Sequence, residues 1–99
     1  MGKRARAEAV FAQIADSHFD AGEDYLEVNT AEIDEDLLTN FLTDVEETFG
    51  IADAEGKVWG NLLSGTPLGA LLARAVQLWD GETLVGVDAD GTWVEPDQR

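Results

Sequence analysis

The chain has 99 residues, 21 acidic side chains against six basic ones, and a net charge of −15. This length predicts a single domain spanning residues 1–99. The charge excludes direct nucleic-acid binding through Lys and Arg and disfavours an anionic membrane as partner, and the lack of Cys excludes disulfides and thiolate metal sites.

The first half of the chain is predicted to be helical. Residues 4–19 are rich in helix formers. Their largest apolar side chains recur at helical spacing and form one stripe, made of Val10, Phe11 and Ile14. Residues 20–24 are expected to form a loop, and residues 25–28 a short strand or an extended segment.

The second predicted helix ends at Phe49, where Gly50 stops it. Asn29 or Thr30 is its expected N-cap, and with Asn29 in that place Glu32 takes the third position of a capping box. A long apolar stripe follows at helical spacing, made of Ile33, Leu37, Leu38, Phe41, Leu42, Val45 and Phe49.

Two further helices are predicted in the second half. Residues 53–64 indicate a weaker helix, because Gly56 and Gly60 lower its propensity. The next helix is expected to start with Thr66 as N-cap and Pro67 in its first turn.

Two arrangements remain open for the C-terminal part. Asp80-Gly81 is a strong hairpin signal, so residues 76–95 would form a three-stranded antiparallel meander. Alternatively the last helix continues to Trp79, and residues 82–95 alone form an antiparallel β hairpin. Either arrangement makes the fold α+β, with an acidic helical N-terminal half of two to four helices packed against a small sheet. The Trp residues are expected to close the core under that sheet: Trp59, Trp79 and Trp93.

Charge is segregated along the chain. Residues 1–6 hold three bases and no acid, residues 7–56 hold fifteen acids and no Lys or Arg, and residues 57–99 hold six acids and three bases. The middle block therefore carries the whole net charge. Its carboxylates lack Lys and Arg partners within the block, so they repel one another.

The second predicted helix places carboxylates opposite its apolar stripe, about one turn or ~5–6 Å apart. Successive phosphates of a nucleic-acid strand present a similar density of negative charge. The preceding loop and the first helix extend this surface. The predicted partner-binding residues, here called the acid face, are Asp16, Asp20, Glu23, Asp24, Glu27, Glu32, Glu35, Asp36, Asp44 and Glu47.

In size, composition and charge layout, residues 7–56 resemble the small acidic DNA-mimic inhibitors of phages and mobile elements, such as anti-restriction and anti-CRISPR proteins. The resemblance lies in the charge pattern and carries no residue-by-residue correspondence. It implies a non-catalytic inhibitor that occupies the basic groove of a nucleic-acid-binding protein, such as a nuclease or a CRISPR effector complex. Electrostatic attraction would make such binding fast and sensitive to salt.

Two other functions are weighed against this one. The second hypothesis is that the acids serve solubility in a structural or regulatory subunit from a halophilic organism, although salt adaptation should spread them over the whole surface. An enzyme that uses carboxylates is the third hypothesis. It has little support: Ser17 and His18 are adjacent on a helix and point apart, and Gly91 comes too early in residues 88–91 for a calcium loop. We therefore expect no catalytic residues, no metal and no cofactor.

The absence of a signal segment or a long apolar run predicts a cytoplasmic protein.

Overall fold

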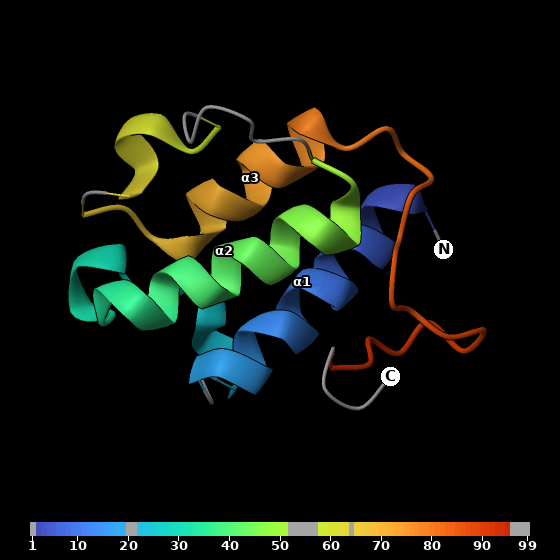
Figure 1. The fold of residues 1–99 in the computed structure, drawn as a ribbon, viewed down its shortest axis with the longest axis horizontal. Coiled ribbons are helices and arrows are strands. Elements are labelled where there is room, and N and C mark those ends of the chain that lie inside the picture. Colours follow the sequence, from blue (N-terminus) through green and yellow to red (C-terminus); the bar gives the residue numbers. More distant parts are fainter. Residues whose placement is uncertain (1, 20–21, 52–57, 64, 96–99) are drawn as a thin grey trace.

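Three α-helices form the body of the molecule (Figure 1). The computed structural model describes residues 2–19, 22–51, 58–63 and 65–95. Within these residues the α-helices are α1 (Lys3–Phe19), α2 (Glu35–Phe49) and α3 (Leu68–Leu78). Short 3₁₀ helices connect them: η1 (Gly22–Glu27), η2 (Thr30–Glu32) and η3 (Gly60–Leu63). After α3, an irregular segment runs back along α1 (Figure 1).

The core lies where the three α-helices meet. Phe11 of α1 packs edge-on against Phe41 of α2, with ring centroids 5.3 Å apart, and Leu71 of α3 is fully buried in the same cluster. The predicted stripe of α1 is confirmed, and most of the predicted stripe of α2 is buried as well: Leu38, Phe41, Leu42, Val45 and Phe49. Burial of these two faces is the main favourable contribution to folding.

The second predicted helix is two elements rather than one. Asn29 caps η2, and its side-chain oxygen accepts a hydrogen bond from the Ala31 N–H at 2.9 Å. Ile33 then takes an extended conformation, and Asp34 caps α2 by accepting from the Asp36 N–H at 3.0 Å. The predicted N-cap at Asn29 was therefore wrong for α2.

The interruption lies at Ile33, whose extended backbone ends η2, while the residues just before η2 pair with the segment that leads into α3. The Thr30 N–H donates to the Thr66 carbonyl at 2.8 Å, and the Leu68 N–H donates to the Val28 carbonyl at 2.8 Å. Thr30 is buried, and its hydroxyl oxygen accepts from the Thr66 N–H at 3.0 Å. The Thr30 carbonyl accepts from the Ile33 N–H at 3.2 Å, which is the i to i+3 bond of a 3₁₀ turn, and the helix starts again only after Asp34.

The same pairing moves the start of α3. Thr66, the predicted N-cap, is engaged with Thr30, and Pro67 occupies the N-cap position instead. Of the predicted helix over residues 53–64, residues 53–57 and 64 lie outside the described residues, and the described part contains only the short helix η3. Arg74 of α3 fixes the start of this stretch, because its Nη1 donates to the Val58 carbonyl at 3.0 Å.

The described residues contain no strand and no sheet, so the predicted α+β fold with a C-terminal hairpin or meander was wrong. α3 continues to Leu78, and beyond it one isolated bridge joins Val87 to Trp93. The turn signals themselves are real. Asp80 and Asp88 each accept two backbone N–H bonds from residues that follow them closely.

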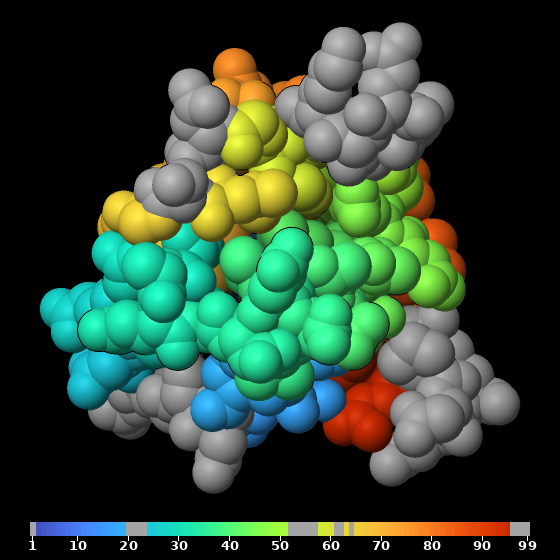
Figure 2. All heavy atoms as spheres, turned by 60° about the vertical axis from the view of Figure 1, so that its left-hand side comes forward, coloured from blue at the N-terminus to red at the C-terminus, as the bar shows by residue number. Residues whose placement is uncertain are grey.

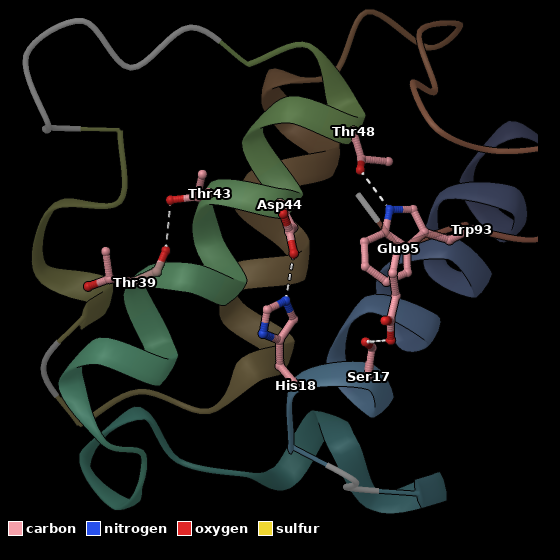
Figure 3. A network of polar contacts seen from close by, with 8 residues as sticks. All are labelled: Ser17, His18, Thr39, Thr43, Asp44, Thr48, Trp93 and Glu95. Carbon is pink, nitrogen blue, oxygen red and sulfur yellow. Dashed lines mark hydrogen bonds and ion pairs between the residues drawn. The ribbon is translucent and has the colours of Figure 1, made fainter. Parts of the chain in front are cut away.

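The C-terminal segment pairs with helices instead of forming a sheet. The side-chain amide of Gln13 accepts from the Trp93 N–H at 2.7 Å and donates to the Gly91 carbonyl at 3.3 Å, as a neighbouring strand would. The Thr48 carbonyl accepts from the Val85 N–H at 2.8 Å, and the Thr48 hydroxyl accepts from the buried Trp93 indole at 3.0 Å (Figure 3). These contacts satisfy backbone groups that a sheet would otherwise pair.

The Trp residues do contribute to the core, although the described residues contain no sheet above them. Trp59 and Trp93 are buried. Trp79 is half-buried and packs against Phe49, with ring centroids 5.9 Å apart.

Gln13→Ala should destabilise the protein by about 1–3 kcal/mol, because it leaves two backbone groups of the C-terminal segment without their partner. Chemical denaturation measures this change. Gln77→Ala, which removes an exposed glutamine from α3, is the matched control and should change the free energy of unfolding little. Equal effects of the two substitutions would contradict the role assigned to Gln13.

Gly50→Ala should destabilise the protein by more than about 1–2 kcal/mol, which is the cost of placing an alanine in the left-handed conformation. Gly50 ends α2 with φ +67°, and an added Cβ would lie 3.0 Å from the Thr83 Cγ2. Gly91→Ala is the control, since Gly91 also has a positive φ but open space around it. Thermal unfolding of both variants should show the larger loss for Gly50→Ala, and a larger loss for Gly91→Ala would contradict the close contact.

Candidate functional site

The part of the chain from η1 to the first turn of α2 is the most acidic surface that the structure describes. It carries exposed carboxylates and no basic residue. We call this surface the acidic end, and its members are Asp24, Glu27, Glu32, Asp34, Glu35 and Asp36. All but Asp34 belong to the predicted acid face.

The two ends of the molecule differ in how their charges are balanced. The structure measures 34 × 28 × 27 Å, and along its longest axis η2 and the start of α2 lie at one end while the N-terminus lies at the other (Figure 1). Near the N-terminus, acids are matched by bases: Arg4 pairs with Glu8 at 2.9 Å, and Lys3 lies 3.9 Å from Glu82.

Among the described residues, no Lys, Arg or His lies within ion-pair distance of any carboxylate of the acidic end. The first turn of α2 accounts for part of this arrangement. Glu35 and Asp36 lie there, and Asp34 is the cap, so the positive end of the helix dipole stabilises their charge by about 0.3–1 kcal/mol each. Asp24 and Glu27 lie on η1, outside that turn, and this stabilisation does not reach them.

Asp44 differs from the other residues of the predicted acid face, because it is mostly buried and has a partner. Its Oδ2 lies 2.7 Å from Nε2 of His18, and both side chains are only about one-sixth exposed (Figure 3). The His18 ring also packs edge-on against Phe41, with centroids 5.9 Å apart. This contact ties α1 to α2, so Asp44 contributes to the fold and presents little charge to a partner. His18 therefore lies at the edge of the core.

The remaining predicted residues are dispersed. Asp16 is exposed on α1, and Glu47 is exposed in the last turns of α2. Asp20 and the side chain of Glu23 lie outside what the structure describes. The residues of the acid face from 24 to 36 thus lie on the continuous segment from η1 to the first turn of α2, whereas Asp16 lies on α1 and Asp44 and Glu47 lie farther along α2.

The acids of the C-terminal segment are used for a different purpose. The Asp80 carboxylate accepts hydrogen bonds from the Thr83 hydroxyl and N–H and from the Glu82 N–H. These bonds lower the pKa of Asp80 from 3.8 to about 2, and the bond from the Thr83 hydroxyl makes the largest contribution. Asp88 turns the chain in the same way. Elsewhere, burial and, to a smaller extent, the charge of Glu8 raise the pKa of the Tyr25 phenol.

Asp80→Asn should lower the stability at pH 7 and leave it unchanged near pH 2. Because the folded-state pKa of Asp80 lies below its ordinary value, its carboxylate stabilises the fold above about pH 4, and the effect is lost as the pH falls toward 2. Urea unfolding of both proteins across this pH range measures the difference. Curves separated by a constant amount at every pH would contradict the assignment.

An apolar groove borders the acidic end. It has a volume of about 340 Å³ and lies between η2, α2 and η3. In Figure 2, η2 and α2 are teal to green, and the described residues of η3 are yellow. Leu38 and Leu42 of α2 form its base, and Ile33, Leu63, Thr30 and Glu35 are among the residues around them. The sequence analysis did not identify this groove. Its signal in the sequence was Ile33, which belongs to the apolar stripe but stands in the non-helical turn before α2.

The described residues show neither a metal site nor a membrane span. No group of three or more His, Asp or Glu side chains there is placed to hold an ion, and no helix there has the length and apolar character needed to cross a bilayer. No family model, curated protein or solved structure matches the chain.

Proposed function

We propose that the protein is a non-catalytic inhibitor whose acidic end mimics nucleic-acid phosphates and occupies the basic groove of a nucleic-acid-binding protein. Its targets would be cytoplasmic nucleases or effector complexes of the restriction or CRISPR kind. One observation carries the proposal: an exposed cluster of carboxylates at one end of a folded body, with no described Lys, Arg or His within ion-pair distance.

The charge density of this surface supports the proposal. The segment from Asp24 to Asp36 bears six acidic residues and no basic one. Three of them, Asp34, Glu35 and Asp36, are consecutive residues, and a nucleic-acid strand carries one phosphate for each ~3.4 Å of its axis. A groove lined with Lys and Arg would find comparable negative charge on both.

The distribution of charge favours a basic partner over adaptation to salt. Adaptation to salt predicts acids that are spread over the whole surface and that make no structural contacts. In this protein Asp80 and Asp88 accept hydrogen bonds that turn the chain, and Glu8 and Glu82 face bases near the N-terminus. The six acids of the acidic end instead lie on one continuous segment, and no described Lys, Arg or His lies within ion-pair distance of them, which favours recognition by a second molecule.

The charge of the acidic end is tested with the double variant Glu35→Gln/Asp36→Asn. Both side chains are exposed, so the fold should persist with a loss of no more than about 1 kcal/mol for each helix-dipole contact. Partner association should slow several-fold to about tenfold at low salt and by less at high salt, because steering depends on the removed charges. Stopped-flow mixing with the captured partner measures these rates.

The matched control is Glu82→Gln/Asp90→Asn, which removes the same two charges from exposed positions outside the acidic end. Partners are first captured from a bacterial lysate at low salt, eluted with duplex DNA as competitor and identified by mass spectrometry. The proposal expects DNA-eluted proteins that bind the control like wild type and the double variant weakly. Equal capture by both variants, or the absence of any protein that DNA displaces, would overturn it.

A further inference from the structure

We propose that the groove between η2, α2 and η3 receives the apolar side chains of a basic amphipathic helix of the partner, while the acidic end binds the cations of that helix. This inference rests on the proposed function and adds to it an anchor that is not electrostatic. The groove, rather than the cluster of acids, is the feature that carries it.

The first step is the chemistry of the groove. Leu38 and Leu42 at its base are 8% and 5% exposed, and Leu63 at its side is 41% exposed. Its volume of about 340 Å³ falls in the range of sites that bury a ligand, about 300–1,000 Å³. Burial of further apolar surface against these leucines is favourable by roughly 25 cal/mol for each Å².

The second step is the charge around the groove. Glu35 lines it, and Glu32, Asp34 and Asp36 are its neighbours along the chain, all of them exposed. None of the described residues that line it is basic. An apolar segment with Lys or Arg on its flanks therefore complements both the base and the surroundings of the groove, whereas an acidic segment would be repelled. A second copy of this chain is disfavoured for the same reason, since each copy carries a charge of −15.

The third step is the conformation of the occupant. The part of the chain that the structure describes has no sheet edge to which a partner strand could add. The walls of the groove come from α2 and two 3₁₀ helices. Such a surface suits an amphipathic helix whose apolar side chains recur at i, i+3 and i+4.

The test uses two synthetic peptides with the same number of Lys residues. In the first, Leu occupies one helical face, and in the second every Leu is replaced by Ser. Fluorescence anisotropy gives the dissociation constant of each peptide with the full chain. The Leu peptide is expected to bind about tenfold or more tightly than the Ser peptide, as the loss of a central apolar anchor typically costs this factor or more.

Two variants place the binding in the groove. Leu63→Gln should remove most of the tenfold preference for the Leu peptide. Leu78→Gln, which changes a leucine of similar exposure at the end of α3, should keep it. A Leu peptide made entirely of D-residues is a third control. If binding depends on the shape of the groove, the D-peptide should lose the preference that the L-peptide shows over the Ser peptide. If the D-peptide keeps that preference, binding is nonspecific and the groove is not the anchor.

The failures of the two proposals are distinguishable. If the Leu and Ser peptides bind equally, or if Leu63→Gln and Leu78→Gln behave alike, the groove is not the anchor, and the inference is overturned. If Glu35→Gln/Asp36→Asn binds both peptides as tightly as wild type, the acidic end does not attract cations, and the proposed function fails with it. Equal binding of an uncharged Leu peptide would show a general apolar site and would also overturn the inference.

Discussion

The pairing of residues 28–30 with residues 66–68 fixes the position of everything that we assign to function. It anchors the approach to η2, and the extended Ile33 then separates η2 from α2, which Asp34 rather than Asn29 caps. Because the same pairing joins the approach to α2 with the approach to α3, it brings η2 close to η3 and creates the groove between them. Two backbone hydrogen bonds and one buried threonine thus link the acidic end to the core.

The concentration of charge at this end opposes folding, because like charges a few ångströms apart repel one another. Two features of the fold limit that cost. The carboxylates of the acidic end are exposed, where water and salt screen them, and three of them lie at the positive end of the α2 dipole. The mostly buried acid of the predicted face, Asp44, is matched with the single histidine of the chain. The remaining repulsion is the part that cations of a partner would relieve.

The sequence predicted the elements whose apolar faces repeat at helical spacing. α1 and the body of α2 bury the expected stripes, since burial of an amphipathic face requires only that another apolar face be present. The prediction from the sequence failed for the C-terminal segment. The turns at Asp80 and Asp88 do form, but the segments between them do not pair as strands. Gln13 and Thr48 satisfy Trp93 from 80 and 45 residues away in sequence, and no local pattern reveals such contacts. The groove depends in the same way on contacts between η2 and η3.

Charge alone would make a poor inhibitor of a nucleic-acid-binding protein. Long-range attraction mainly accelerates encounter, and physiological salt weakens it. Nucleic acid offers the same basic groove an equal or greater density of negative charge along a much longer surface. A small mimic therefore needs a contribution that nucleic acid does not make, and apolar burial acts on the dissociation rate without being screened by salt. The position of an apolar groove beside Glu35 places both contributions within one surface.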